Sequence, residues 1–441
     1  MLKPYGKNPF YWERHGRPLL LMGGSVEDNL FQIPDLEEHL RLLADTGGNY
    51  IRCTLSSRDP GDVWPFERGE GGLYDLNQPS REYWSRFERC VELCKKLGIV
   101  IQVEIWDRFD FAREPWHENP FNPANNRNYP AAESRLDTDY PGHPSERQNP
   151  FFRSVPKLEN NAVLLNYQRA FVDRILKRTL PHDHILYCMD NETNESPEWG
   201  RYWAEYIKAE ARNIGRGVFC TEMWDAHDIN HSMHEATWRH PDLYGFCDIS
   251  QNNHQSGENH YKNLIRFRTR LAMSNRPRPL NNVKIYGADT GRYGSERDGT
   301  ERFWRNVFAG CASVRFHRPP VGIGLSDTAR THIRAMRAFV DRFPVYQSRV
   351  ANERLSQREP NEAFCLIRPG QGSAVYLPAG GHVQLAAAPR DSYRIHWLDI
   401  ERAEWRAPLN TILEKGLIDL STPDPGGAWV AVVVEGDGAA R

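Results

Sequence analysis

The sequence lacks any long hydrophobic run. A membrane-spanning helix needs about 20 consecutive apolar residues, and no stretch of the 441-residue chain approaches that length. The N-terminal residues Met1-Leu2-Lys3-Pro4-Tyr5-Gly6 also lack the apolar core of a secretory signal. We therefore expect a cytoplasmic protein with no membrane partner.

An excess of charge of one sign is also missing. The chain has 56 Lys and Arg residues against 58 Asp and Glu residues, which gives a formal net charge of -2. Proteins that bind nucleic acids or anionic membranes use clustered positive charge. The composition therefore gives no reason to expect either partner, and a neutral ligand is the simpler expectation.

The cysteines lack the spacing of a metal site. Five of the eight lie in or beside apolar, strand-like segments, which is typical of buried thiols: Cys53, Cys188, Cys220, Cys247 and Cys311. Cys90 and Cys94 are four residues apart on a predicted helix, but no Cys-x-x-Cys pair or His cluster accompanies them. We expect no metal and no cofactor.

What the chain does have is an alternation of short apolar segments and amphipathic helices. The strands are expected at Pro18–Met22, Asn49–Thr54, Val100–Ile105, His184–Cys188, Gly217–Glu222, Tyr244–Ile249, Val283–Ala288 and Cys311–Phe316. The helices are expected at 34–45, 80–97, 161–180, 197–213, 258–274, 300–310 and 328–343. This pattern predicts an α/β fold, a parallel (β/α)8 barrel over residues 1–344, with its site at the C-terminal ends of the strands.

Two regions depart from the alternation. Residues 107–160 are rich in Pro, Asn and Arg, and a loop this long at the active face of a barrel is typically a lid or substrate wall. Trp116 in this loop is a candidate substrate contact; the alternative is an ordinary surface excursion. After about residue 344 the helices give way to short strand-like pieces separated by turns, which predict a small all-β sandwich over residues 345–441.

The most informative feature is the Asn191-Glu192 pair, directly after the predicted strand His184–Cys188. At this position an Asn can bind a substrate hydroxyl while the neighbouring carboxyl group protonates a leaving oxygen. Asp190 is a rival acid. It shares a side of the strand with Glu192 only if the strand stays regular through Asn191, and we prefer Glu192.

The second and third strands end on further polar and aromatic residues. Arg52 ends one of them and is expected to brace a carboxylate of the site; the alternative is a structural ion pair. Trp106 and Asp107 end the other, as an aromatic platform and an acid for the substrate. The alternative for these two is a core Trp beside an outward-facing Asp.

The sixth and seventh strands complete the predicted rim. The run from Asp248 to His254 is polar, as a sugar site would be, and His254 is a candidate contact for the substrate or the nucleophile. Tyr286 and Asp289 follow the seventh strand. Asp289 is therefore the second carboxylate that we expect to work with Glu192.

These residues resemble the pattern of glycoside hydrolases of clan A, which are (β/α)8 barrels with catalytic carboxylates ending strands four and seven. Arg52, Asn191, Glu192 and His254 match the clan's residues at strands two, four and six. The segments Tyr11–Leu20 and Phe303–Ala312, with the β domain that follows, are similar to the apiosidase-like subgroup. The resemblance implies a carbohydrate substrate and a glycosidase.

The second carboxylate departs from the clan's pattern. The clan carries Glu at the end of strand seven, whereas this chain has Asp289, and Glu296 lies seven residues further on as an alternative. A retaining mechanism needs two carboxyl groups about 5 to 5.5 Å apart. We expect Glu192 to be the acid/base and Asp289, braced by Arg52 and Tyr286, to be the nucleophile.

Three alternatives stay open on the sequence. The first is an inverting glycosidase that uses Asp289 as general base. A second is a catalytically weak carbohydrate-binding barrel, which the missing strand-seven Glu favours. The third, a lyase or aldolase, would need a rim lysine for a Schiff base; Lys284 lies early in its strand, so this reading is the weakest.

Overall fold

The structure is a computed structural model, and it describes residues 2–288 and 291–435. The chain divides into two compact units, each with its own set of strands and helices. The first unit contains residues 1–2, 27–44 and 49–251; the second contains residues 3–26, 45–48 and 252–441. Among the described residues, no helix is long and apolar enough to cross a membrane.

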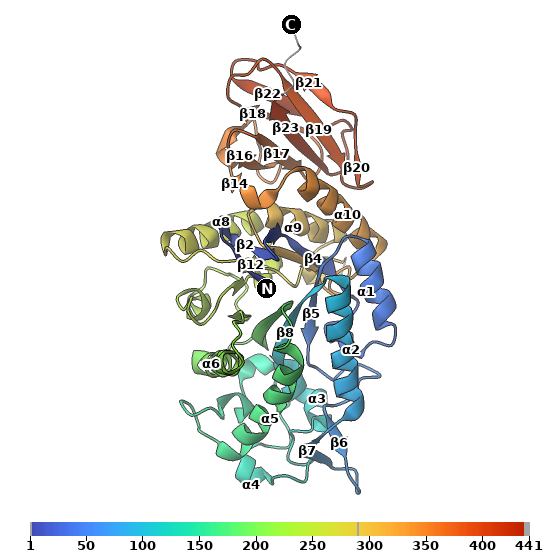
Figure 1. The fold of residues 1–441 in the computed structure, drawn as a ribbon, viewed down its shortest axis with the longest axis vertical. Helices are drawn as coiled ribbons and strands as arrows, with labels where there is room; N and C mark the ends of the chain where they lie inside the picture. The colour runs from blue at the N-terminus through green and yellow to red at the C-terminus, as the bar shows by residue number, and fades with distance from the viewer. Residues whose placement is uncertain (1, 289–290, 436–441) are drawn as a thin grey trace. The chain divides into compact units, whose positions relative to one another are not determined.

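The first unit is built on a four-stranded parallel sheet in the order β10-β9-β8-β5. Figure 1 labels its neighbouring strands β8 and β5. Its strands are β5 (Tyr50–Thr54), β6 (Phe66–Arg68), β7 (Tyr74–Pro79), β8 (Val100–Asp107), β9 (Ile185–Asn191), β10 (Cys220–Thr221) and β11 (Cys247–Asp248). Its helices are α1 (Leu36–Asp45), α2 (Arg81–Leu97), α3 (Arg113–Glu118), α4 (Ala131–Ser134), α5 (Ala162–Thr179), α6 (Pro197–Asn213) and α7 (Glu235–Trp238).

Local sequence signals set the ends of these helices. The side chain of Ser80 accepts a hydrogen bond from the Tyr83 N–H at the start of α2, and Gly98, with φ of 74°, ends that helix. Asn161 caps α5 in the same way, and Pro197 occupies the first turn of α6. The predicted helices are therefore confirmed with small shifts at their ends.

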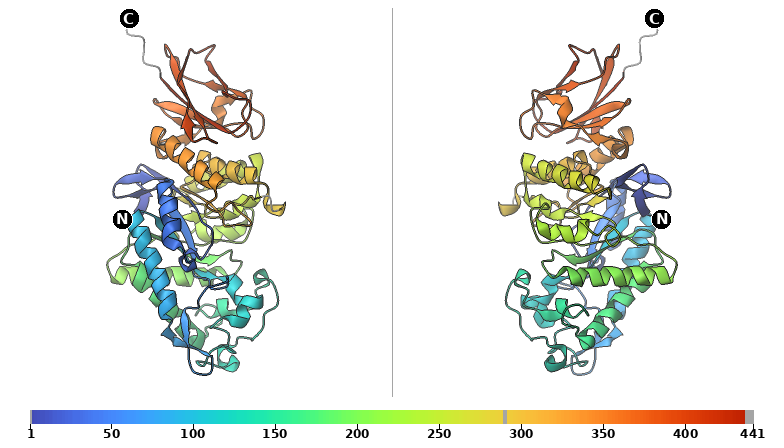
Figure 2. Two further views of the ribbon diagram at one scale, coloured as in Figure 1. Left: turned by 90° about the vertical axis from the view of Figure 1, so that its right-hand side faces the viewer. Right: turned by 90° about the vertical axis from the view of Figure 1, so that its left-hand side faces the viewer.

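The second unit contains a parallel strand pair, three long helices and the C-terminal sheets. Its first strands are β1 (Leu2–Tyr5), β2 (Asn8–Arg14), β3 (Arg17–Leu19), β4 (Leu21–Gly24), β12 (Leu280–Asn281) and β13 (Ser313–Phe316). β4 pairs in parallel with β13. The helices α8 (Gly257–Met273), α9 (Glu296–Phe308) and α10 (Asp327–Arg342) lie side by side (Figure 2).

The strand prediction for residues 283–288 is wrong in detail. The strand in this part of the chain is β12, which ends before residue 283. Within 283–288, Ile285 forms an isolated parallel bridge to Phe316. Within the described residues, strand pairing does not close a ring of eight strands.

The eight cysteines all lie in the described residues, buried and without a disulfide, which confirms the expectation of buried thiols.

Residues 349–435 form a β domain of two antiparallel sheets (Figure 1). Its strands are β14 (Arg349–Val350), β15 (Leu355–Ser356), β16 (Phe364–Arg368), β17 (Gly372–Leu377), β18 (His382–Ala386), β19 (Tyr393–Asp399), β20 (Glu404–Trp405), β21 (Leu409–Thr411), β22 (Leu417–Ser421) and β23 (Trp429–Glu435). Alternate residues of both sheets, among them Val375, Leu385 and Trp397, share one apolar cluster. These C-terminal sheets fit the β domain that the sequence predicts.

The long segment 107–160 is folded around aromatic side chains. Trp116 lies on α3 with 0% of its surface exposed, and its indole N–H donates to the Asp137 carbonyl at 3.1 Å. Its ring packs against Phe111 at 6.0 Å and Tyr140 at 5.6 Å between centroids. The expectation that Trp116 stacks on a substrate is therefore not supported, because its ring faces are covered by neighbouring side chains.

We predict that Trp116→Ala destabilises the protein by about 3 to 5 kcal/mol, the usual cost of deleting a buried Trp side chain. Urea denaturation followed by tryptophan fluorescence would measure this loss. Trp238→Ala, at a partly exposed Trp of the same unit, is the matched control and should cost clearly less. A Trp116→Ala variant of normal stability with weakened sugar binding would contradict the packing role.

Candidate active site

A buried ion pair joins the neighbouring strands β5 and β8 of the first unit. Arg52 on β5 donates from Nε and Nη2 to the two carboxylate oxygens of Glu104 on β8, both at 2.7 Å. Its remaining nitrogen, Nη1, pairs with Asp28. The side chains of Arg52 and Glu104 are both 0% exposed. Such a bidentate pair satisfies charges that would be very costly to bury alone.

This pairing bears on the expected role of Arg52. We expected it to brace Asp289, which lies outside the described residues. All three nitrogens of its guanidinium group contact Glu104 or Asp28. The described partners of Arg52 thus correspond to the structural ion pair that was the alternative on the sequence.

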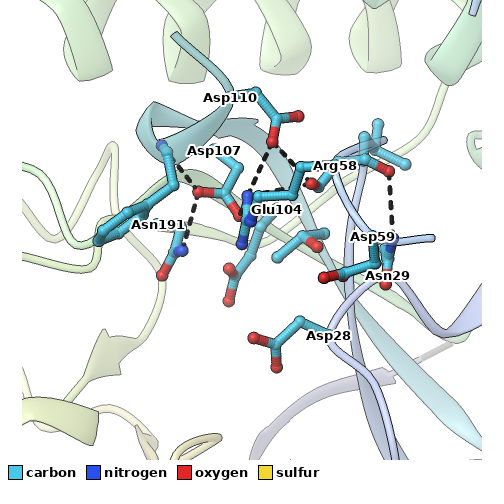
Figure 3. A network of polar contacts seen from close by, with 12 residues as sticks. Asp28, Asn29, Arg58, Asp59, Glu104, Asp107, Asp110 and Asn191 are labelled. Carbon is cyan, nitrogen blue, oxygen red and sulfur yellow. Dashed lines mark hydrogen bonds and ion pairs between the residues drawn. The ribbon is translucent and has the colours of Figure 1, made fainter. Parts of the chain in front are cut away.

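A second charged network lies at the ends of β8 and β9 (Figure 3). Asp107 accepts a hydrogen bond from the Asn191 side-chain amide at 3.0 Å and one from the Phe109 N–H at 3.2 Å, both on Oδ1. Its other oxygen, Oδ2, pairs with Arg58 Nη1 at 2.8 Å. Asp107 is only 3% exposed, so its carboxylate holds Asn191 and Arg58 in place rather than meeting a ligand.

Arg58 joins this network to Asp110. Its Nη1 lies 2.8 Å from Asp110 Oδ1, and the Ser56 hydroxyl donates to the same oxygen at 2.7 Å. Burial raises the pKa of Asp110 to about 6, while the Arg58 charge opposes that rise. Figure 3 shows Arg58 between Asp107 and Asp110, where its positive charge is shared by two carboxylates.

Glu192 follows directly on the last residue of β9. Its backbone is in the left-handed region, with φ of 54°, which is uncommon for a residue other than Gly. The side chain is partly exposed, whereas Asp190 is 0% exposed. β9 runs through Asn191 in unchanged register with β8, and the backbone leaves the strand conformation at Glu192 itself. The difference in exposure supports Glu192 over Asp190 as the carboxylate that reaches solvent.

Trp106 does not supply the aromatic platform that we expected. It is 1% exposed, and its ring lies among six other aromatic rings at centroid distances of 5.3 to 6.4 Å: Phe111, Phe121, Phe151, Phe171, Trp199 and Trp203. Three of these belong to α5 and α6, so Trp106 packs into the helix layer. The structure therefore agrees with the core alternative for Trp106, but Asp107 is buried as well and does not face outward.

In the second unit, the candidate residues His254 and Tyr286 lie together. Their ring centroids are 4.8 Å apart, and the Tyr293 ring contacts both, at 4.8 Å from Tyr286 and 5.8 Å from His254. The rival carboxylate Glu296 is the first residue of α9 and accepts a hydrogen bond from the Thr328 hydroxyl at 2.8 Å. It lines a cavity of about 600 Å³ together with Asp327 and His332.

The sequence analysis missed several residues of these networks. Asp28, Arg58, Glu104 and Asp110 were not singled out, although Arg58 and Asp110 follow the ends of β5 and β8, where rim residues are expected. Glu104 and Asp28 gave no signal, because their role depends on which arginine they meet. Across the described residues, no group of three His, Cys, Asp or Glu side chains is arranged to hold a metal ion.

Solved structures with a similar fold cover nearly the whole chain. A glycoside hydrolase family 5 protein from Bacteroides vulgatus is 12% identical, with a TM-score of 0.65 over 98% of this chain and 93% of its own. The α-amylase of Geobacillus thermoleovorans is 12% identical, with a TM-score of 0.57 over 95% of this chain and 99% of its own. An endo-1,4-β-mannanase from Rhizomucor miehei is 11% identical, with a TM-score of 0.52 over 75% of this chain and 96% of its own.

These similarities show a shared fold, that of TIM-barrel enzymes. No protein-family model matches the sequence, and a comparison with curated proteins gives no match.

We predict that Arg52→Met destabilises the protein by about 3 to 5 kcal/mol, because it leaves Glu104 and Asp28 buried without their cation. Thermal and urea unfolding would measure the loss. Arg41→Met removes an exposed pair to Glu37 in the same unit and should cost about 1 kcal/mol or less. An Arg52→Met variant as stable as Arg41→Met would contradict the structural role.

Proposed function

We propose that the protein is a glycosidase built on a (β/α)8 barrel, with Glu192 as the acid/base. The fold similarity to glycoside hydrolases over nearly the whole chain supports the class. The observation that carries the proposal is the end of β9, where Asn191 is fixed by Asp107 and the next residue, Glu192, turns out of the sheet in the left-handed conformation.

The arrangement divides the chemistry between neighbouring residues. The hydrogen bond to Asp107 at 3.0 Å fixes the orientation of the Asn191 amide, which prepares it to bind a sugar hydroxyl next to the cleaved bond. Glu192 protonates the leaving oxygen while the second carboxylate attacks the anomeric carbon, and Glu192 then removes a proton from the water that releases the sugar. This is a retaining double displacement.

We propose Asp289 as the nucleophile. Asp is one methylene shorter than Glu, which draws the carboxylate back from the sugar; that favours the inverting alternative, in which the carboxyl groups are about 6.5 to 9.5 Å apart and a water lies between them. We prefer retention because Glu192 and a strand-seven carboxylate occupy the positions that the sequence resemblance assigns to the catalytic pair.

The charges of the first unit support a neutral or weakly charged glycoside. An anionic sugar would need an available cation, whereas Arg52 and Arg58 are each held by two carboxylates. Arg108, 2% exposed, donates to the Asn194 side chain and lies 3.5 Å from Asp225. We therefore propose an uncharged oligosaccharide or glycoside as the substrate.

A screen of aryl glycosides, including pentofuranosides, tests the proposed function directly. Hydrolysis of one of them would establish the class and the sugar together. Binding of a sugar without hydrolysis of any glycoside would instead support the catalytically weak carbohydrate-binding barrel.

We predict that Glu192→Gln lowers kcat by orders of magnitude on substrates with poor leaving groups. Activated aryl glycosides, which need little protonation, should lose far less activity. The matched control is Glu195→Gln, at a carboxylate of the same loop that pairs with Arg147 at 3.2 Å; this variant should show no such dependence on the leaving group. Equal losses on both substrate types would remove Glu192 from the acid role.

We predict that the first product retains the anomeric configuration of the substrate, which proton NMR before mutarotation would show. Asp289→Gly should be inactive and should regain turnover in added azide, because azide occupies the space of the nucleophile. Glu296→Gln should remain active. Inverted product would overturn the nucleophile role of Asp289, and full activity of Asp289→Gly would transfer that role to Glu296.

A further inference from the structure

The pairing of β9 with β10 changes register next to Glu192, the proposed acid/base. Tyr187 pairs with Cys220 and Cys188 with Thr221, so partners are 33 positions apart in the sequence. Beyond the irregularity Thr193 pairs with Trp224, 31 positions apart. Four residues of the β9 side, 189–192, therefore lie opposite two residues, 222 and 223. This is a two-residue bulge, and Glu192 is its last residue.

The ladder resumes directly after the bulge. The Thr193 N–H donates to the Met223 carbonyl at 2.8 Å, and the Asp225 N–H donates to the Thr193 carbonyl at 2.8 Å. Glu192 is thus followed directly by a parallel bridge, while the last regular pair before the bulge is Cys188 with Thr221. Bulges of this kind redirect side chains and occur often next to active sites. Here the left-handed φ of Glu192 is the local conformation that the bulge imposes.

A side chain binds one of the backbone groups in the bulge. The Asp190 N–H donates to Oε1 of Glu222 at 2.8 Å. Glu222 is the residue directly after β10 and is 1% exposed. Its carboxyl group therefore supplies an acceptor for a main-chain N–H inside the bulge.

Helix α6 fixes the other side of this carboxyl group. A Cβ atom placed on Gly200 would lie 1.9 Å from Glu222 Oε2, a distance at which something must move. Because Gly200 has no side chain, the helix backbone approaches the carboxyl group closely. Glu222 is enclosed between the bulge on one side and α6 on the other, and it cannot withdraw from Asp190.

We propose that Glu222 is a positioning residue for the acid/base: it accepts the Asp190 N–H, stabilises the bulge and so directs Glu192 into the site. This inference rests on the proposed function. Burial raises the pKa of Glu222, and the neighbouring Asp190 raises it further. A glutamine, which is neutral, of the same shape and able to accept the same hydrogen bond, should therefore replace Glu222 well.

Two substitutions of Glu222 test the proposal. Glu222→Leu removes the acceptor and should lower kcat at least tenfold on substrates with poor leaving groups, with a smaller loss on activated aryl glycosides and a change in KM of less than twofold. Glu222→Gln keeps the acceptor and should retain kcat within about threefold. A merely structural role would lower both substrate types equally, which would overturn the proposal.

Gly200→Ala provides a second approach that leaves Glu222 in place. The added methyl group should displace the carboxyl group and reproduce the kinetic pattern of Glu222→Leu. Gly200→Ala with wild-type kinetics on poor leaving groups would contradict the proposal. This variant keeps the test decisive if Glu222→Leu does not fold.

Hydrogen exchange of the Asp190 amide, in protein labelled with ¹⁵N-aspartate, provides a readout that needs no substrate. Glu222→Leu should speed this exchange at least tenfold relative to wild type, and Glu222→Gln should not. Unchanged exchange in Glu222→Leu would overturn the inference even if glycosidase activity is found. Wild-type protein that hydrolyses no glycoside would refute the proposed function, and the exchange result would then separately decide whether Glu222 stabilises the bulge.

Discussion

Charge neutralisation inside the parallel sheet of the first unit is the constraint on which the candidate site depends. Arg52 and Glu104 are completely buried on neighbouring strands, and either charge alone would be strongly destabilising there. Their bidentate contact, completed by Asp28, fixes how β5 and β8 face each other. The same principle extends to the ends of the strands, where Arg58 compensates Asp107 and Asp110. Polar residues at the rim are thus fixed before any ligand arrives.

This closed set of charges has a functional consequence. A site whose cations are already paired offers hydrogen bonds rather than net charge, which supports our proposal of an uncharged sugar as the substrate. The network also gives polar residues at the strand ends different roles. Asp107 serves Asn191, and Asn191 in turn precedes the residue that we propose to act on the glycosidic oxygen. Preorganisation of this kind lowers the reorganisation needed during the reaction.

The aromatic residues in and beside the long segment 107–160 pack into the core rather than forming a surface for a sugar ring. Trp116 of this segment and Trp106 directly before it were candidates for contact with a sugar, yet both are buried in one aromatic cluster beside α5 and α6. The cluster anchors the segment through packing rather than leaving it free to close over a ligand. Contacts of the segment with the loop after β9, such as the Asn194 amide donating to the Ser145 carbonyl at 2.7 Å, connect it to the proposed acid.

The sequence by itself determined the elements whose signals are local. Helical periodicity and capping residues located α2, α5, α6 and α10, and apolar runs located β5, β8 and β9 with Asn191 and Glu192 at a strand end. Only the tertiary structure decided the rest, because the deciding contacts join residues far apart in the chain. Arg52 meets Glu104 across 52 positions, and Trp106 is covered by helices that follow it by more than 60 positions. The bulge over residues 189–192 depends on how this segment pairs with β10 and the residues after it. The periodicity of β9 alone cannot indicate it, because a bulge is defined by the number of residues that lie opposite it on the partner strand.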